Sequence, residues 1–229
     1  MRARDDGGLY PLRDRGSFPL LQKLTIGDER SIFSLWMTPT TKERILEAAE
    51  EIMLTKSFHS VGLTEILAAV KLPKGSFYHH FNSKEQFGVE LISHYIQQHT
   101  ARMRKFFDAP GTKALQRFVD YWAFQIGHAT EADCQQGCLV VKLGLEVASF
   151  SEPMREVLAD GLKTWRGIFE KAIRAGQKDG SIRKKLDPPQ TAAAIQDQWQ
   201  GAMQRMQVEK NVAPLRSAAQ FLRASLAVA

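Results

Sequence analysis

Residues 63–81 read LTEILAAVKLPKGSFYHHF and contain two short helical patterns separated by one break. The apolar residues of the first pattern fall on one side of a helix predicted over 63–70. Pro73 ends this pattern, because proline lacks an amide hydrogen and disfavours a helical conformation in the residue before it. A second short helix is predicted over 74–81. Two short helices joined by a tight turn have the size of a helix-turn-helix, whose second helix enters the major groove of DNA.

The same helical periodicity extends along the chain, and almost no stretch alternates apolar and polar residues as a strand would. An amphipathic helix is predicted over 42–56, and a long helix over 84–107 with Ser83 as its N-cap. Further helices are predicted over 113–130, 138–150, 153–177, 188–209 and 214–226. Ser151 and Asp187 are expected N-caps, each followed by a first-turn proline.

The sequence therefore predicts an all-α protein with two folded parts. Residues 37–85 are expected to form an N-terminal three-helix helix-turn-helix DNA-binding domain, and 86–229 a larger helical domain for effector sensing and dimerisation. Residues 1–36 carry several glycines and two prolines and lack a sustained period, so we expect a disordered extension. Two interpretations of it stay open: translation from a start codon upstream of Met37, and a functional arm. The helix that begins at Lys84 spans both folded parts and is the expected lever between them.

Composition narrows the class of protein. Of the 229 residues, 44% are hydrophobic and 24% are charged, which is enough for a substantial core. No apolar run approaches the ~20 residues that cross a bilayer, and the first residues lack the apolar segment of a signal peptide. Two cysteines are too few for a disulfide scaffold and lack zinc-site spacing. We expect a cytoplasmic protein with no membrane association, metal or cofactor, and the net charge of +6 favours an anionic partner.

The second short helix has residues suited to DNA. Lys74, Gly75 and Ser76 open it with one cation and two small residues, so its N-terminus can approach phosphates and base edges closely. Phe77 and Phe81 are four residues apart, and we expect both to pack inward as an ordinary small core. This leaves the other side of the helix to face the groove.

Tyr78 and His79 lie on that other side, and Lys84 begins the next helix close to a flanking phosphate. Residues 58–85, FHSVGLTEILAAVKLPKGSFYHHFNSKE, resemble the DNA-binding signature of TetR-type transcriptional repressors. The resemblance implies that Tyr78 and Lys84 hold phosphates while the start of the second helix meets the groove. The family's usual capping Ser or Thr is Gly62 here, which is also an acceptable N-cap. The residues expected to contact DNA are Thr64, Lys74, Gly75, Ser76, Tyr78, His79 and Lys84.

The C-terminal part carries a second resemblance. Residues 137–146, GCLVVKLGLE, and 151–155, SEPMR, are similar to the branch of these repressors that answers reactive electrophiles or acrylate-like molecules. Cys138 lies at a predicted helix start with Lys142 one turn later, and both features favour a low thiol pKa. Cys138 is therefore the candidate sensor thiol. The alternative is that it packs as a small apolar side chain, as free cysteines commonly do.

Two other positions bear on thiol chemistry. Cys134 could act as a resolving thiol after oxidation of Cys138, but its neighbours Glu131 and Asp133 disfavour the thiolate there. Several relatives in this branch carry lysine where this chain has Gln207. The absence of that amine weakens the transfer of any lysine-assisted thiol mechanism to this chain.

A reversible ligand site is also possible between the helices of the C-terminal part. The candidate lining residues are Trp122, Phe124, His128, Lys142, Trp165, Trp199 and Met203, with ordinary core packing as the alternative for the apolar members. The last two predicted helices could pair with their copies in a four-helix bundle. A twofold homodimer would match a palindromic operator.

The sequence thus predicts an inducible repressor. A homodimer binds palindromic double-stranded operator DNA and is released when an electrophile or oxidant acts at Cys138. One alternative is the same repressor induced by a small molecule bound reversibly in the C-terminal part. Another is a constitutive DNA-binding protein. An enzyme is disfavoured, because the chain has no H-E-x-x-H, G-x-S-x-G or Walker sequence.

Overall fold

The structure is a computed structural model that describes residues 39–134 and 137–228. These residues belong almost entirely to one compact unit, Thr41–Ala229. The expected extension, residues 1–36, lies outside the described residues. None of the described helices is long and apolar enough to cross a membrane.

The described part of the chain is built from α-helices, with one isolated bridge between Ile182 and Ala227 in place of any strand. The predicted all-α class is confirmed. The helices are α2 (Thr41–Thr55), α3 (Leu63–Ala69), α4 (Ser76–His80), α5 (Lys84–Phe107), α6 (Ala114–Glu131), α7 (Leu139–Val147), α8 (Glu152–Asp179), α9 (Pro188–Glu209) and α10 (Ala213–Leu226).

Side-chain caps fix the starts of the three longest helices where the sequence places them. Ser83 accepts a hydrogen bond from the Gln86 amide at 3.0 Å, and Ser151 accepts one from the Met154 amide at 3.4 Å. Asp187 begins α9 in the same way. Each cap satisfies one of the amide donors that a helix start leaves unpaired. Helix α7 is shorter than predicted, because the residues after Val147 form a turn that leads into the Ser151 cap.

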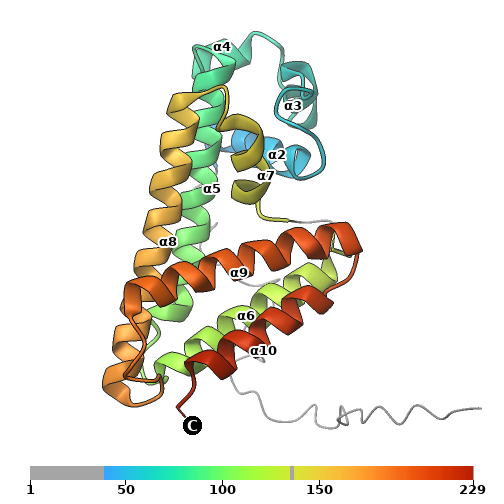
Figure 1. Cartoon of the computed structure of the whole chain (residues 1–229). Helices are drawn as coiled ribbons and strands as arrows, with labels where there is room; N and C mark the ends of the chain where they lie inside the picture. Colours follow the sequence, from blue (N-terminus) through green and yellow to red (C-terminus); the bar gives the residue numbers. More distant parts are fainter. Residues whose placement is uncertain (1–38, 135–136, 229) are drawn as a thin grey trace, which may run out of the picture. The chain divides into compact units, whose positions relative to one another are not determined.

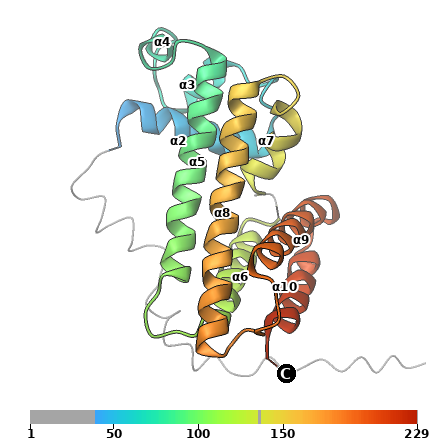
Figure 2. The same ribbon diagram turned by 60° about the vertical axis from the view of Figure 1, so that its left-hand side comes forward.

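Helices α5 and α8 lie side by side and run in parallel (Figures 1 and 2). Three polar contacts follow one another along both helices in the same order. Ser151 Oγ donates to Glu85 at 2.6 Å, Trp165 Nε1 donates to Thr100 Oγ1 at 2.9 Å, and Lys171 Nζ lies 3.2 Å from Asp108. Helices α2 to α4 gather near the N-terminal ends of this pair, and α6, α9 and α10 near the C-terminal ends (Figure 1).

A small aromatic core joins the helix-turn-helix to α5. The rings of Phe77, Phe81 and Phe87 lie with their centroids 5.0 to 5.4 Å apart. All three side chains are buried. The expectation that Phe77 and Phe81 pack inward is confirmed, and this packing fixes α4 against the start of α5.

The Ile96 side chain of α5 packs directly against the backbone of α8 at Gly161. A Cβ atom added there would lie 2.3 Å from Cδ1 and 2.9 Å from Cγ1 of Ile96 on α5. At Gly167, two turns further along α8, an added Cβ would meet nothing within 4 Å. Gly161 therefore permits the helix contact, whereas Gly167 does not contribute to it.

These two glycines give a matched test of the α5–α8 packing. We expect Gly167→Ala to raise the free energy of unfolding by about 0.5–1 kcal/mol, because alanine has the higher helix propensity. Gly161→Ala should lower it by about 1–3 kcal/mol, because the added methyl group overpacks the contact. Urea denaturation followed by circular dichroism measures both. Equal stabilisation by the two substitutions would contradict the packing.

Candidate nucleic-acid interface and effector site

The turn between α3 and α4 is closed by backbone hydrogen bonds. The amide of Leu72 donates to the carbonyl of Leu67 at 2.9 Å, and the amide of Lys71 donates to the carbonyl of Ala68 at 3.1 Å. This pattern is a Schellman motif, and its left-handed residue is Lys71, with a φ of 57°. Glycine usually fills that position, which is why the sequence signals only Pro73 as the break. The turn fixes where α4 begins relative to α3.

The residues expected to contact DNA lie mostly on the surface of this unit. Thr64, Lys74, Gly75, Tyr78 and His79 are exposed. The Tyr78 side chain is 63% exposed although its ring contacts buried Phe77 edge-on at 5.5 Å. Ser76, the first residue of α4, is partly exposed. The aromatic core thus holds one side of α4 and leaves the other side accessible to a large partner.

Lys84 differs from the other expected contacts because its ammonium group already has partners within the chain. Its Nζ donates to the carbonyls of His59 at 3.2 Å and Val61 at 3.0 Å. It also lies 5.2 Å from the centroid of the Phe58 ring. A lysine ammonium has three donors, so these two bonds leave one for a phosphate.

Cys138 lies at the start of a helix, as expected, but the pKa of its thiol is raised instead of lowered. Cys138 is the N-cap residue of α7, and its side chain is buried. Burial raises its pKa, outweighing the backbone amides of Val141 and Val140 and the Tyr95 hydroxyl, which favour the thiolate. The predicted low pKa is therefore wrong. The helix start acts as expected, but removal of the thiol from water has the larger effect.

Polar rings on α5 and α6 adjoin Cys138, and the sequence analysis did not single them out: Tyr121 is buried, and Tyr95 and His99 are half-buried. The Tyr95 hydroxyl shares a hydrogen bond with the thiol. The Tyr95 ring stacks on His99 at 5.9 Å, and His99 Nε2 lies 3.1 Å from the Tyr121 hydroxyl. Burial lowers the pKa of His99 to about 3, so this imidazole is neutral at physiological pH. No motif signals this group, because its members are divided among α5, α6 and the start of α7.

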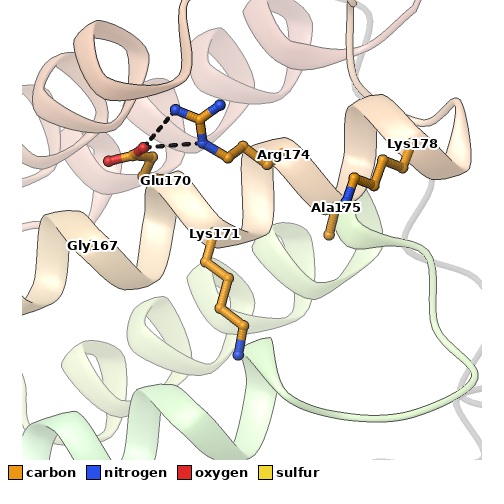
Figure 3. A pocket seen from close by; sticks show the side chains of 6 residues that line it. All are labelled: Gly167, Glu170, Lys171, Arg174, Ala175 and Lys178. Carbon is orange, nitrogen blue, oxygen red and sulfur yellow. Dashed lines mark hydrogen bonds and ion pairs between the residues drawn. The ribbon is translucent and has the colours of Figure 1, made fainter.

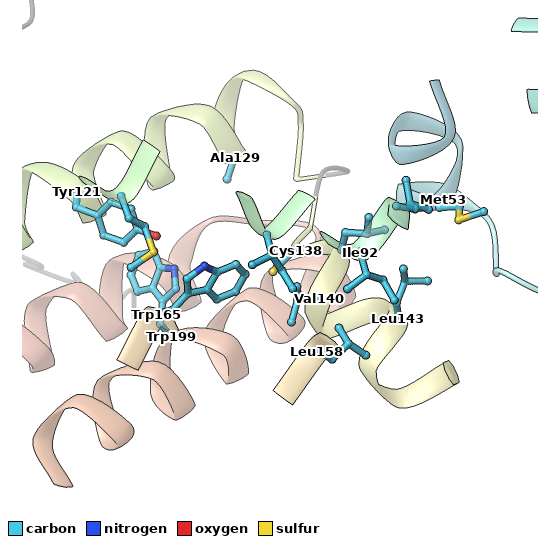
Figure 4. Packing of buried hydrophobic residues seen from close by; sticks show 14 of the residues in the cluster. Met53, Ile92, Tyr121, Ala129, Cys138, Val140, Leu143, Leu158, Trp165 and Trp199 are labelled. Atoms are coloured by element: carbon cyan, nitrogen blue, oxygen red, sulfur yellow. The ribbon is translucent and has the colours of Figure 1, made fainter. Parts of the chain in front are cut away.

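The residues expected to line a ligand site do not all lie together in the structure. Trp122 and Trp199 are buried and stacked with centroids 6.2 Å apart. No described residue accepts a hydrogen bond from either indole Nε1. Trp165 donates to Thr100, as described above. In Figure 4 the indoles of Trp165 and Trp199 lie to one side of Cys138, and Ile92, Val140 and Leu143 lie to the other.

Other residues of that set do not join this group. His128 is exposed on α6 and stacks on Phe124 at 6.2 Å, so its ring faces solvent and the expectation that it lines an interior site is wrong. Lys142 and Met203 are partly exposed. A separate hollow on α8 is lined by charged residues, among them Arg174, which pairs with Glu170 at 2.8 Å (Figure 3). It contains none of the expected lining residues.

Gln207 lies directly beside Gly137, the residue before Cys138. A Cβ atom added at Gly137 would lie 2.1 Å from Nε2 of Gln207, so the amide packs against the backbone next to Cys138. The position at which the resemblance implies lysine in several relatives is therefore adjacent to the backbone of Gly137. In this chain it holds an amide, which is not a nucleophile.

Two family models match the chain. The model for "Bacterial regulatory proteins, tetR family" matches residues 45–91, and the model for "Tetracyclin repressor-like, C-terminal domain" matches residues 111–222. Together they cover the helix-turn-helix and most of the C-terminal helices.

Two repressors and two solved structures are similar to the chain. The HTH-type transcriptional repressor DhaR of Mycobacterium sp. (strain GP1) is 31% identical over 76% of this chain and 86% of its own length. The repressor NemR of Escherichia coli (strain K12) is 29% identical over 78% of this chain and 89% of its own. The reduced form of E. coli NemR superposes with a TM-score of 0.75 at 28% identity, covering 82% of this chain and 98% of that one. A regulatory protein TetR from Rhodobacter sphaeroides gives a TM-score of 0.76 at 30% identity, covering 80% and 97%.

Proposed function

The chain belongs to the TetR family of bacterial regulatory proteins, and we propose that it is an inducible repressor that binds a palindromic operator as a homodimer. Membership makes the chain a DNA-binding transcriptional repressor and not an enzyme. The operator contacts, the dimer and the effector are the proposed parts. The observation that carries the proposal is the exposed face of α4, fixed from behind by buried Phe77 and Phe81.

The DNA contacts are proposed on exposure and chemistry. Lys74 brings a cation to the start of α4, while Tyr78 and His79 bring hydrogen-bonding groups to its exposed side. Phosphate contacts of this kind position a protein on the duplex, and base-edge contacts from the same helix specify sequence. Thr64, Gly75 and Ser76 complete the surface, and the third donor of Lys84 reaches a flanking phosphate.

The dimer is proposed through α9 and α10. These helices contact each other, and their outer sides carry apolar groups. The Phe221 side chain on α10 is 60% exposed, and Met203 on α9 is partly exposed. A twofold axis would cover the same patch on both copies and produce a four-helix bundle. Two α4 helices related by this axis would read the two halves of a palindrome.

The effector is proposed to be an electrophile or oxidant that modifies Cys138. The thiol is buried within the hydrophobic core. An adduct would therefore overpack the core and destabilise the arrangement described here relative to one that binds DNA weakly. The raised pKa makes this reaction slow at neutral pH and faster as the pH rises.

A reversible ligand is the second candidate for the effector. The indole Nε1 groups of Trp122 and Trp199 and the amide oxygen of Gln196 are buried, and no described residue gives them a hydrogen-bond partner. Unpaired buried polar groups are costly, each by about 1–3 kcal/mol. A small polar molecule that formed hydrogen bonds with these groups would remove that cost, and the free energy gained would favour its binding.

The DNA contacts are tested with two lysine substitutions of equal charge change. Fluorescence anisotropy is measured with purified protein and labelled DNA from upstream of its own gene, over a range of salt concentrations. Lys74→Ala should weaken binding and reduce the salt slope by about one, as expected for the loss of one phosphate contact. Lys178→Ala, at an exposed position on α8, should change neither quantity. Equal effects of the two substitutions would contradict the assigned interface, and no DNA binding by the wild type would contradict the proposed function.

The thiol is tested by treating the DNA-bound protein with N-ethylmaleimide. We expect slow release of wild type, with a rate that increases between pH 7 and pH 9 because the thiolate fraction rises. Cys138→Ser should remain bound under the same conditions, and Cys134→Ser should be released like wild type. Release of Cys138→Ser at the wild-type rate would contradict sensing by this thiol. Retention of all three proteins would favour the reversible ligand.

A further inference from the structure

Helix α7 is bonded directly to the loop between α2 and α3. The Glu146 carboxylate accepts hydrogen bonds from the backbone amides of Phe58 at 2.9 Å and His59 at 3.0 Å. One of its oxygens also lies 3.1 Å from Nδ1 of His59. Burial raises the pKa of Glu146, but these bonds have the larger combined effect and lower it, so the group is ionised at neutral pH. Hydrogen bonds to an ionised acceptor are stronger than those between neutral groups.

The same loop is bonded from a second side. The Lys84 ammonium on α5 holds the carbonyls of His59 and Val61, as described above. The Phe150 ring lies 4.3 Å from the His59 ring and 6.3 Å from the Phe58 ring, between centroids. Residues 57–61, called the joint loop from here on, therefore have amides held from α7 and carbonyls held from α5. Movement of α7 relative to α5 would break one set of these bonds.

The two ends of α7 face different parts of the molecule. Cys138 caps its start, and Glu146 lies eight residues later, about 12 Å along the helix axis. Between them, Leu143 is fully buried and Val140 nearly so. Helix α7 contacts α2, α5 and α8. A short helix packed in this way moves as a rigid unit, because close-packed interfaces deform poorly.

We propose that Glu146 is the positioning residue that transmits the state of the effector site to the helix-turn-helix. A change at Cys138 shifts α7, Glu146 shifts with it, and the joint loop alters the placement of α3 and α4. This inference rests on the proposed function, because it concerns how the same repressor is released. It assigns the transmitting contact to one carboxylate and two backbone amides.

The test is a double-mutant cycle on operator affinity that needs no identified effector. Cys138→Phe introduces the bulk of an adduct within the chain, and Glu146→Gln keeps the shape of the side chain but removes its charge. We expect Cys138→Phe to weaken operator binding at least about tenfold in the wild-type background and less than about threefold in the Glu146→Gln background. Glu156→Gln, an exposed carboxylate on α8, should leave the full effect of Cys138→Phe in place. Circular dichroism and thermal melting establish that each variant is folded, and Cys138→Met replaces Cys138→Phe if that variant does not fold.

The results of this test distinguish a failure of the role of Glu146 from a failure of the proposed function. Equal weakening by Cys138→Phe in both backgrounds, or none in either, would overturn the role of Glu146 while leaving operator binding by the wild type intact. Absence of operator binding by the wild type would instead overturn the proposed function and this inference with it. Glu146→Asp provides a further check. It should restore part of the coupling if the charge transmits the change, whereas a purely structural role predicts coupling that follows thermal stability across the variants.

Discussion

The parallel packing of α5 against α8 is the contact on which the described structure depends. Most of the stability of a helix in a folded protein comes from tertiary packing of its apolar face rather than from intrinsic propensity. Here Gly161 leaves room for the Ile96 side chain against α8, and Thr100 satisfies the indole donor of buried Trp165 inside the contact. The other described helices attach to this pair directly or through a neighbour. Because α5 spans about 36 Å, the helix-turn-helix and the proposed dimerisation helices α9 and α10 are held at opposite ends of one rigid support.

The proposed release from DNA requires a part that can move relative to this support, and we propose that the joint loop is that part. The joint loop receives Lys84 from α5 and Glu146 from α7, so it responds to the position of α7 relative to the support. Burial of Cys138 at the other end of α7 fits this arrangement. An exposed thiol would react faster, but its adduct would extend into solvent and displace little. A buried thiol reacts slowly, and its adduct must move the surrounding helices.

Much of the fold could be predicted because its signals are local. Ser83, Ser151 and Asp187 cap helices through atoms three residues away, and Phe77 and Phe81 show their common face by their spacing. The parts that failed depend on distant residues. The pKa of Cys138 is set by burial among other helices, and Lys84 is bonded to carbonyls 23 and 25 residues earlier in the chain. In the sequence, Glu146 belongs to the C-terminal segment that resembles other repressors, but no pattern indicates its role. Its hydrogen bond to a loop 87 residues away has no sequence signature.

We propose that modification at Cys138 breaks the hydrogen bonds that hold the joint loop. Amide hydrogen exchange at Phe58 and His59 measures this most directly. In the unmodified protein, both amides should be protected by the Glu146 carboxylate. After N-ethylmaleimide has reacted with Cys138, both should exchange at least about tenfold faster, while amides in the middle of α8 keep their protection. Unchanged protection of Phe58 and His59 in modified protein that has lost its affinity for DNA would contradict the account.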